Sequence, residues 1–412
     1  MRIGIVHPAF LRRGGAENLT LWLASGLAQR DHAVTLFAAG LALDRWSEID
    51  LTGVRTVELP DRHDSFWHEP SRSRHHGGII AEHSSEADVL VCGIHPAHLW
   101  LSQALALMSR PPASVLYCHE PRRKYYYMWT DWPTVTYVDS GQRTLPLHDK
   151  LARLVRYRRR ANQLSKAPFA RWYDRREMAR LDRIVANSRF TADNASRAWR
   201  RQVEVCYPGV PVPATPTAPN PKDRTGVVVL TGWDVAKNPM GVLGTINEIV
   251  HHFGRRDIPF TITGSDIRPE YEAYIRDHDL SDVVSVRNYV SEDEKAALLR
   301  QARLCLFIPF AEPFGLVLIE AMLHHTPVIA ANHGGPGEVV VDGKTGRLVD
   351  VFKPREVART VVELYDDTTL LAEFGRAGAR TAREEFGLPA FLDRFELQLL
   401  AARDERTGAR TA

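Results

Sequence analysis

Two series of short apolar runs alternate with helical patterns along this chain. Just after the first run, Leu19, Leu23 and Leu27 lie four residues apart, a spacing typical of one face of a helix. The strand-like runs of this first series are Arg2–Pro8, Ala33–Ala39, Asp88–Ile94, Ser114–His119 and Arg183–Ser188. Strands that alternate with helices predict a parallel sheet covered on both faces.

The second series is more regular than the first. Its helix at Ser291–Arg303 begins with a serine that can cap the first turn, followed by three acidic residues that suit the helix dipole. The strand-like runs of this series are Gly226–Gly232, Pro259–Gly264, Val283–Val290, Leu304–Phe310 and Pro327–Ala331. This alternation predicts a second parallel sheet.

A proline-rich stretch separates the two series. Residues 207–221 contain six prolines, which neither a helix nor a central strand tolerates. We therefore predict an α/β fold of two doubly wound, Rossmann-like domains that face each other across a cleft, with ligands at the carboxyl ends of the strands. The expected parts are a first domain at 1–206, a linker at 207–224, a second domain at 225–390, and a final helix at 391–412 that packs back on the first domain.

Composition narrows the class of protein. The 412 residues are 44% hydrophobic and 25% charged, and the net charge is +3, which is typical of a globular enzyme-sized chain. The four cysteines lie far apart without a C-x-x-C spacing, so we expect neither disulfides nor structural zinc. No apolar run reaches the roughly 18 residues of a spanning helix, and the first residues resemble a strand more than a signal peptide. We expect a cytoplasmic protein, with a peripheral position at the inner face of the membrane left open.

The strongest local motif follows the run Leu304–Phe310. Because Pro313 cannot lie deep in a helix, Glu312 belongs to a loop and Glu320 to the body of the next helix. Backbone N–H groups around Gly315 are then unpaired at a helix N-terminus, an arrangement that binds anions. Two carboxylates beside such a site suit recognition of sugar and ribose hydroxyls. The alternative is an ordinary helix with a first-turn acid and a solvated glutamate.

The E-x7-E spacing of Glu312 and Glu320 resembles the signature of the family-four retaining glycosyltransferases, which have the glycosyltransferase-B architecture. The resemblance extends over nearly the whole chain, and mannosyltransferase-type members are the most similar in motif. Its other segments are Gly14-Gly15-Ala16-Glu17, Cys118-His119-Glu120-Pro121, Ala186-Asn187-Ser188-Arg189-Phe190-Thr191, Val205-Cys206-Tyr207-Pro208-Gly209-Val210, Gly334-Gly335-Pro336-Gly337-Glu338 and Asp342-Gly343-Lys344-Thr345-Gly346.

The resemblance implies roles for particular residues. Glu312 and His119 are expected to contact the transferred sugar at the reacting centre, and Glu320 to contact the ribose of the nucleotide. Lys237 is expected to bind the donor diphosphate. The remaining expected donor contacts come from the backbone or from glycines, namely Gly14, Gly15, Phe314, Gly315 and Leu316. The alternative for His119 is a core or capping histidine.

One position departs from the family pattern. The family usually has Gly-Arg-x4-Lys after the first strand of the second domain, whereas here Gly232 is followed by Trp233, with Lys237 in place. Loss of one charged contact to a phosphate costs about 1.5–3 kcal/mol if nothing replaces it. Arg12, Arg13 and Arg189 are candidates to replace it. The other interpretations are a donor held differently and a protein without activity.

Several other motifs fail on inspection. The segment Asp342–Thr345 lacks the first glycine of a P-loop, and no G-x-G-x-x-G follows the first strand. A nucleophile–base pair at Cys118 and His119 is unfavourable because neighbouring strand residues point to opposite faces. The histidines between residues 63 and 83 have irregular spacing, so we expect an exposed loop there and no metal site. These histidines are His63, His68, His75, His76 and His83.

Positive charge is concentrated between residues 150 and 183. This segment holds 12 basic residues against 3 acidic ones, and aromatic residues such as Phe169 and Trp172 lie among them. Such a segment suits an anionic membrane surface, and the alternative is a solvated arginine-rich face. Nucleic acid is not an expected partner, because the charge is local and no nucleic-acid module is visible.

The resemblance implies a retaining, metal-independent hexosyltransferase without a cofactor. The resemblance implies a nucleotide-diphosphate sugar as donor, with GDP-mannose favoured over UDP-sugars, bound by the second domain. The first domain is expected to bind the acceptor, a glycan, a lipid-linked sugar or a small molecule. The alternatives are a phosphorylase or sugar-nucleotide epimerase of the same fold, and a non-catalytic sugar-nucleotide-binding or membrane-associated scaffold protein, which Trp233 motivates.

Overall fold

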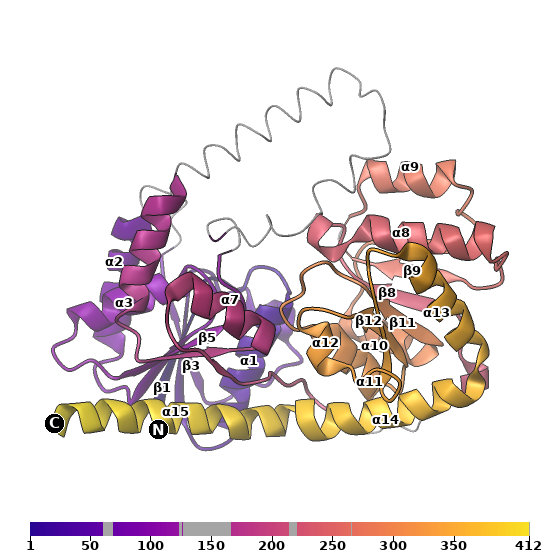
Figure 1. Ribbon diagram of the computed structural model, residues 1–412. Coiled ribbons are helices and arrows are strands. Elements are labelled where there is room, and N and C mark those ends of the chain that lie inside the picture. Colours follow the sequence, from indigo (N-terminus) through magenta and orange to yellow (C-terminus); the bar gives the residue numbers. More distant parts are fainter. Residues whose placement is uncertain (61–68, 123–125, 127–165, 214–220, 265, 412) are drawn as a thin grey trace. The chain divides into compact units, whose positions relative to one another are not determined.

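The computed structural model describes all residues except 61–68, 123–125, 127–165, 214–220, 265 and 412 (Figure 1). The chain forms two compact units. Unit 1 comprises Met1–Gly209 and Leu388–Ala412, and unit 2 comprises Val210–Gly387. The second unit is therefore inserted, in sequence, before the last helix of the first.

Unit 1 is built on a parallel sheet with the order β3-β2-β1-β4-β5-β6-β7 within its described residues. The strands are β1 (Arg2–His7), β2 (Ala33–Ala38), β3 (Val54–Glu58), β4 (Val89–Cys92), β5 (Ala113–Cys118), β6 (Arg183–Ala186) and β7 (Glu204–Val205). The central strands β4 and β5 are buried along their whole length, as expected for a sheet covered on both faces. β1 lies between β2 and β4, so the strand order reverses direction at this point.

Helices cover this sheet and supply its two core layers. On one side α1 packs with α15 against Ile5, Val91 and Tyr117, and on the other α3 and the helical residues 166–178 lie over Leu90 and Leu116. The helices of the unit are α1 (Gly15–Ala28), η1 (Leu43–Trp46), α2 (Glu69–His83), α3 (Ala97–Leu107), α7 (Arg189–Trp199) and α15 (Leu388–Thr411), together with residues 166–178.

Unit 2 has a second parallel sheet with the order β10-β9-β8-β11-β12-β13 within its described residues. The strands are β8 (Val227–Leu230), β9 (Phe260–Thr263), β10 (Val284–Arg287), β11 (Leu304–Phe307), β12 (Val328–Ala331) and β13 (Gly346–Val349). Here the order reverses direction between β8 and β11. In open sheets of this kind, ligands bind beyond the carboxyl ends of the strands at such a reversal.

Helices connect the strands of unit 2. They are η3 (Pro221–Asp223), η4 (Val235–Lys237), α8 (Pro239–Asn247), the π-helical turn η5 (Glu248–His252), α9 (Pro269–Asp277), α10 (Glu292–Gln301), α11 (Leu316–Leu323), α12 (Pro336–Val339), α13 (Pro354–Asp366) and α14 (Thr368–Phe386). α10 begins with a complete capping box, in which Ser291 and Glu294 exchange side-chain and backbone hydrogen bonds.

The predicted fold class of two doubly wound α/β units is confirmed. Three strands that the apolar pattern did not indicate complete the sheets. β3 is an edge strand with mostly exposed residues, β7 has only two residues, and β13 follows the tight turn at Asp342-Gly343. Strands this short or this polar lack the apolar run on which the prediction depended.

The structure describes part of the expected linker at 207–224 and nearly all of the expected final helix at 391–412. Residues 214–220 of the linker lie outside the described residues. The last helix begins at Leu388 and packs in unit 1 on α1 and on β5, where Phe391 and Phe395 contact the ring of Tyr117.

The expected exposed loop between residues 63 and 83 is wrong where the structure describes it. His75, His76 and His83 lie on α2, and His76 is buried, with its Nε2 atom 2.9 Å from the carbonyl oxygen of Pro60. His63 and His68 lie outside the described residues. The helix was missed because its mean hydropathy is low and its apolar face is short.

Candidate functional site

The candidate site in unit 2 is formed by three loops at the carboxyl ends of β8, β11 and β12. These strands are neighbours in the sheet, so the segments that follow them, residues 231–238, 308–315 and 332–335, meet at one edge. Direct hydrogen bonds tie the first two loops together. Asn238 Nδ2 donates to the carbonyl oxygen of Ile308, and the N–H of Phe310 donates to the carbonyl oxygen of Ala236.

Glycines allow the second and third loops to pack backbone against backbone. The N–H of Gly335 donates to the carbonyl oxygen of Glu312 at 2.9 Å. A Cβ atom at Gly335 would lie 2.2 Å from the Cα of Phe314, and one at Gly334 would lie 2.7 Å from the Glu312 carbonyl oxygen. Only glycine fits this approach, which explains the Gly-Gly pair in physical terms.

The helix α11 begins at this packed junction. Its N-cap, Gly315, has φ +100°, a conformation that L side chains rarely adopt, and no side chain of the described residues caps the helix. The first turn contains no acidic residue, so the N–H groups after Gly315 keep their partial positive charge uncompensated. The ring of Phe314 is buried against Phe386 of α14 and holds the loop in place.

Two predicted site residues contact each other here. Lys237 Nζ lies 2.6 Å from Glu312 Oε2, and the lysine side chain is 38% exposed while the glutamate is 15% exposed. The ammonium also lies 6.0 Å from the centre of the Phe307 ring. A phosphate that binds Lys237 must therefore compete with Glu312 for this cation, or share it.

Glu320 lies on α11, apart from this pair. Its Oε1 atom is 3.0 Å from Nζ of Lys295, a residue of α10, and Lys295 also lies 2.7 Å from Glu292 Oε2. Burial raises the pKa of the Glu320 carboxyl, and the nearby ammonium opposes this shift. Burial alone would lower the pKa of Lys295, but Glu320 and Glu292 outweigh it and raise that pKa. Lys295 was not among the predicted site residues, because a lysine in a charged helix has no motif of its own.

Trp233 is a core residue of unit 2. Its side chain is 2% exposed and stacks on Tyr271 of α9, with ring centres 5.4 Å apart. The indole Nε1 atom is buried and has no hydrogen-bond partner among the described residues. Where the family pattern has an arginine, this chain therefore has a ring that attaches α9 to the loop after β8.

In unit 1, the loop between β1 and α1 carries the other predicted glycines. Gly14 is the N-cap of α1 and Gly15 is its first residue, but the acidic residue that follows them covers this end of the helix. A Cβ atom on Gly14 would lie 2.4 Å from Glu17 Oε2. Burial would raise the pKa of Glu17, but the neighbouring His7 and the backbone N–H of Glu17 outweigh it and lower this pKa.

His7, at the end of β1, is oriented by the first turns of α1. Thr20 Oγ1 donates to the carbonyl oxygen of Ala16 at 2.8 Å and lies 3.2 Å from His7 Nδ1. Since a hydroxyl has one proton, the His7 Nδ1 atom must donate in that contact. The Nε2 atom of His7 then faces Glu17 Oε1 at 3.8 Å, and the His7 side chain is 1% exposed.

His119 follows β5, as the pattern predicted, and is half-buried. Its ring packs edge-on against Tyr117, with centres 5.2 Å apart, and a Cβ atom on Gly93 would lie 3.6 Å from its Nε2 atom. Burial first, and then the neighbouring His7, lower the pKa of His119 to about 4, while Glu17 opposes the shift. The imidazole is therefore neutral near pH 7. The adjacent Cys118 is fully buried, and burial raises the pKa of its thiol well above its usual range, so it has no thiolate character.

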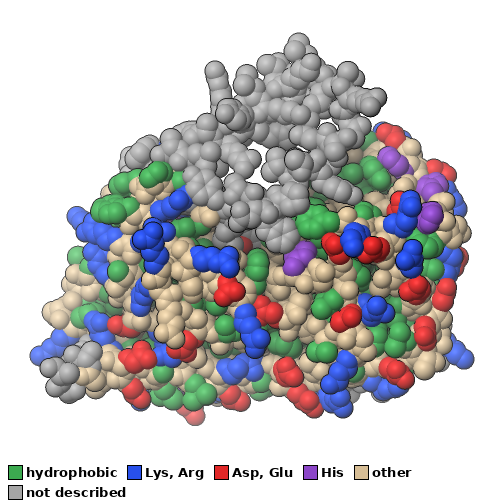
Figure 2. Space-filling model, viewed as in Figure 1, with side chains coloured by type: hydrophobic (Ala, Val, Ile, Leu, Met, Phe, Trp, Pro, Cys, Tyr) green, Lys and Arg blue, Asp and Glu red, His purple; other side chains and the backbone are tan. Residues whose placement is uncertain are grey.

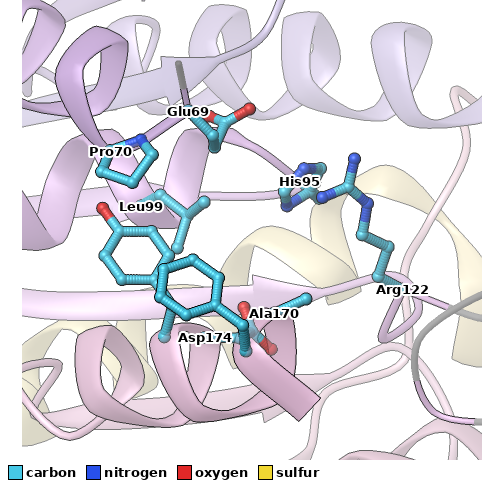
Figure 3. Close-up of a pocket in the computed structure, with 9 residues that line it drawn as sticks. Glu69, Pro70, His95, Leu99, Arg122, Ala170 and Asp174 are labelled. Carbon is cyan, nitrogen blue, oxygen red and sulfur yellow. The ribbon is translucent and has the colours of Figure 1, made fainter. Parts of the chain in front are cut away.

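Unit 1 also contains a pocket beyond the ends of β4 and β5 (Figure 3). Arg122 and His95 project from one side and Glu69 from the start of α2. At its base, Asp174 accepts hydrogen bonds from Tyr126 and Trp199 and contacts His98. Burial would raise the pKa of the Asp174 carboxyl, but these three partners outweigh it and lower this pKa. The other lining residues are Pro70, Leu99, Phe169, Ala170 and Tyr173.

Two family models match the chain and together cover most of it. The model described as Glycosyltransferase Family 4 matches residues 13–212, and the model described as Glycosyl transferases group 1 matches residues 237–381. The two matches together show a family-four-like glycosyltransferase. Each model corresponds to one of the two structural units.

Individual relatives of this glycosyltransferase are similar over part of their length. A D-inositol 3-phosphate glycosyltransferase of Paenarthrobacter aurescens is 39% identical over 136 residues, which is 32% of this chain and 33% of the relative. The α-1,3/1,6-mannosyltransferase alg-2 of Neurospora crassa is 26% identical over 282 residues, 57% of this chain and 59% of the relative. The matches therefore span between a third and three fifths of these relatives.

Solved structures show the same glycosyltransferase-B fold. HepE of Anabaena, solved in complex with UDP and glucose, superposes with a TM-score of 0.73 and 15% identity, covering 97% of this chain and 100% of HepE. A sucrose-phosphate synthase from Thermosynechococcus elongatus superposes with a TM-score of 0.72 and 17% identity, covering 97% and 99%.

The basic segment of this glycosyltransferase is described from residue 166 onward. Within the helical residues 166–178, Phe169 is 42% exposed and Trp172 is 55% exposed, and the guanidinium of Arg176 lies 5.6 Å from the Trp172 ring centre. Residues 150–165 lie outside the described residues. On the face shown in Figure 2, Lys and Arg side chains alternate with Asp and Glu over both units.

Two further features bear on ligands. Among the residues that the structure describes, no group of three or more His, Cys, Asp and Glu side chains is placed to hold a metal ion. Within the same residues, no helix combines the length and the hydropathy needed to span a bilayer.

Proposed function

We propose that this protein transfers a hexose from a nucleoside-diphosphate sugar to a hydroxyl group of an acceptor, with retention of the anomeric configuration and without a metal ion. The observation that carries the proposal is the junction in unit 2. There the carboxyl ends of β8, β11 and β12 bring together Lys237, Glu312 and the uncapped N-terminus of α11. A cation, a hydroxyl acceptor and backbone N–H groups at a helix N-terminus are the groups that a sugar diphosphate requires.

In this proposal the diphosphate binds Lys237 and the N–H groups of Phe314, Gly315 and Leu316. Glu312 then leaves or shares the ammonium, and its carboxylate accepts hydrogen bonds from the donor sugar. Negative charge develops on the departing diphosphate as the bond between the anomeric carbon and the phosphate oxygen breaks. The ammonium and the helix N-terminus stabilise that charge, which is the role a metal ion has in other enzymes.

The acceptor hydroxyl attacks the anomeric carbon from the face that the diphosphate leaves, and its proton passes to the diphosphate. No side-chain nucleophile is required for this step. His119 contributes as a neutral hydrogen-bonding group to a sugar hydroxyl, which its low pKa of about 4 favours. In unit 1, Gly14 and Gly15 take a phosphate oxygen only when Glu17 is displaced from the start of α1.

GDP-mannose is the donor we favour, followed by UDP-sugars. The support is the similarity to α-1,3/1,6-mannosyltransferases of two fungi, Neurospora crassa and Schizosaccharomyces pombe. The HepE structures, which carry UDP and glucose, support the second choice. We place the acceptor at the pocket of Figure 3, where Arg122 and the aromatic residues Phe169 and Tyr173 suit an acceptor with both an anionic and an apolar part.

An anionic membrane surface is a proposed partner of the basic segment. Exposed Phe169 and Trp172 beside Arg176 combine apolar rings with positive charge, and each basic residue near a bilayer contributes about 1 kcal/mol. Replacing both rings by serine is expected to reduce binding to vesicles that contain anionic lipid. Equal binding by both forms would contradict this partner.

Trp233 favours one alternative function, a protein that binds a sugar nucleotide without turning it over. Because Trp233 is packed in the core against Tyr271, a Trp233→Arg substitution would disturb α9 and cannot by itself restore the family pattern. The two functions differ in turnover alone, so product formation distinguishes them.

The experiment is a thermal-shift screen of the purified protein against GDP, UDP and ADP and their hexose conjugates, with and without EDTA. A ligand at 100 times its dissociation constant adds about 2.7 kcal/mol of stability and shifts the melting temperature visibly. We expect one nucleotide to stabilise the protein equally with and without EDTA. We then expect its sugar conjugate to donate the sugar to an acceptor with retained anomeric configuration. Absence of any shift would contradict the proposed donor site.

A further inference from the structure

Lys295 is a half-buried cation at the predicted ribose-binding carboxylate. Its side chain is 19% exposed, and its Nζ atom lies between Glu320 Oε1 at 3.0 Å and Glu292 Oε2 at 2.7 Å. Neither family resemblance nor the charge pattern assigned it a role. Lys295 lies on α10 and Glu320 on α11, two helices that pack against each other.

The position of Lys295 is fixed by the start of α10. The capping box of Ser291 and Glu294 fixes the first turn of the helix. Glu292 and Lys295 are three residues apart in the sequence, so in this helix they lie on one face. The lysine is therefore held from its own helix by Glu292 while it reaches across to Glu320.

Glu320 presents one oxygen to Lys295 and keeps the other. Oε1 is hydrogen-bonded to the ammonium, and among the described residues no donor contacts Oε2. A carboxylate that is 16% exposed and has no cation beside it would be strongly favoured in its protonated, neutral form. A neutral carboxyl is a weaker hydrogen-bond acceptor for a hydroxyl than a carboxylate.

We infer that Lys295 is a positioning residue for ribose recognition, which holds Glu320 ionised through Oε1 so that Oε2 accepts hydrogen bonds from the ribose diol. This inference rests on the proposed function, in which Glu320 binds the ribose of the donor. Lys295 itself touches no part of the nucleotide. Its effect is confined to ligands that possess the diol.

The charged and titratable groups around the pair allow a clear pH test. Glu292 faces Lys295 from α10, Cys305 faces Glu320 from β11, and His324 lies at the end of α11. Burial first, and then the nearby cations Arg300, Arg224 and Lys295, lower the pKa of His324 to about 4. Burial raises the pKa of the Cys305 thiol to about 12. In the intact protein neither group changes charge between pH 6 and 9. Removal of Lys295 relieves one of the three cations near His324, whereas it removes the hydrogen-bonded cation of Glu320, so we expect Glu320 to respond most.

The experiment measures dissociation constants for UDP and GDP and for their 2′,3′-dideoxy counterparts, using whichever base the protein binds. The intact protein is expected to bind the ribonucleotide roughly tenfold more tightly than the dideoxy form. Lys295→Met is expected to weaken ribonucleotide binding about tenfold at pH 7 and to leave dideoxy binding unchanged. Raising the pH to 9 is expected to restore part of the loss, because Glu320 then ionises without its cation.

A matched control is available in the same unit. Lys353 also lies between two carboxylates, Asp350 and Glu356, but its side chain is 54% exposed, and the proposed function places neither carboxylate at the nucleotide. Lys353→Met is expected to change neither nucleotide affinity nor the preference for ribose. If Lys295→Met does not fold, Lys295→Gln, which keeps an N–H donor and removes the charge, makes the same test.

The outcomes separate this inference from the function on which it depends. If the intact protein does not distinguish ribose from dideoxyribose, the placement of Glu320 at the ribose is wrong. If it does distinguish them, but Lys295→Met retains the full preference or weakens both nucleotides equally, the role assigned to Lys295 is wrong and the proposed function stands.

Discussion

Both units contain a helix that starts with glycine just after a parallel strand, yet the two helix starts differ in charge. α11 of unit 2 follows Gly315 and has no acidic residue in its first turn, whereas α1 of unit 1 follows Gly14 and has Glu17 folded back over that glycine. Helix N-termini attract anions, so the first is open to a phosphate and the second already has a carboxylate. Similar motifs therefore do not imply equal binding, and we expect most of the affinity for the diphosphate to come from unit 2.

The largest expected effect concerns the packed junction beneath α11. In Gly335→Ala the new methyl group would meet the backbone of Phe314 at 2.2 Å, so the two loops must separate. We expect the free energy of unfolding to fall by about 2–3 kcal/mol, in the range of overpacked cores. Chemical denaturation measures this change.

Gly232→Ala is the matched control, because a Cβ atom there has no neighbour within 4 Å among the described residues and the backbone has no positive φ. It is expected to change stability by less than about 1 kcal/mol. Equal losses in both variants would show that the close approach at Gly335 does not hold the junction.

The second prediction tests the open helix start through its cation. Lys237→Met removes a charge-assisted contact to the diphosphate, which stabilises binding by about 1.5–3 kcal/mol. We expect nucleoside-diphosphate affinity to fall between roughly tenfold and a hundredfold, measured by titration calorimetry. Lys344→Met, which changes an exposed lysine of the same unit, is the control. Unchanged affinity in Lys237→Met would show that the diphosphate does not bind at this loop.

The third prediction compares the two units by pH. His119 of unit 1 and His324 of unit 2 both have a pKa lowered to about 4, chiefly by burial. The unfolded chain binds a proton at each position below about pH 6.5, while the folded protein does not until near pH 4. The stability that comes from keeping these two histidines neutral is therefore fully present above pH 6.5, and it is lost as the pH decreases toward 4.

Each histidine is expected to contribute about 1–2 kcal/mol to the loss between pH 6.5 and 5. Comparing denaturation at the two pH values for His119→Gln and for the intact protein measures the share of unit 1. A variant with the same pH dependence as the intact protein would show that His119 is not held neutral.

The sequence predicted the two sheets and the position of each motif because both depend on local pattern. Strands were visible as apolar runs, and Glu312 and Gly315 were visible by their spacing around a strand end. Lys237 was visible through the resemblance to the family pattern. Contacts between separate segments were not visible in this way. The pairing of Lys237 with Glu312, the hold of Lys295 on Glu320 and the folding of Glu17 over Gly14 all depend on side-chain directions that appear only when neighbouring elements are in place.

Trp233 illustrates the same limit at a position where the sequence departs from the family pattern. As a missing arginine it raised the question of which cation replaces it. As a buried ring stacked on Tyr271 it has a structural role of its own. Of the candidate replacements, Arg13 is held by Glu48 and by the carbonyl oxygen of Arg45, so this guanidinium is already engaged in unit 1.

The smallest expected effect is also the most direct test of the contrast between the two helix starts. Glu17→Gln removes the carboxylate over Gly14 while keeping the side-chain shape. Loss of its interaction with the helix dipole is expected to lower the free energy of unfolding by about 0.3–1 kcal/mol. If Gly14 and Gly15 receive a phosphate, nucleoside-diphosphate affinity should increase about two- to threefold, because the ligand no longer displaces an anion.

Glu86→Gln, at an exposed ion pair with Arg2, controls for the loss of one negative charge in unit 1. Tighter binding in Glu17→Gln alone would mean that the carboxylate competes with the ligand, and unchanged binding would mean that the diphosphate is held by unit 2 without the start of α1.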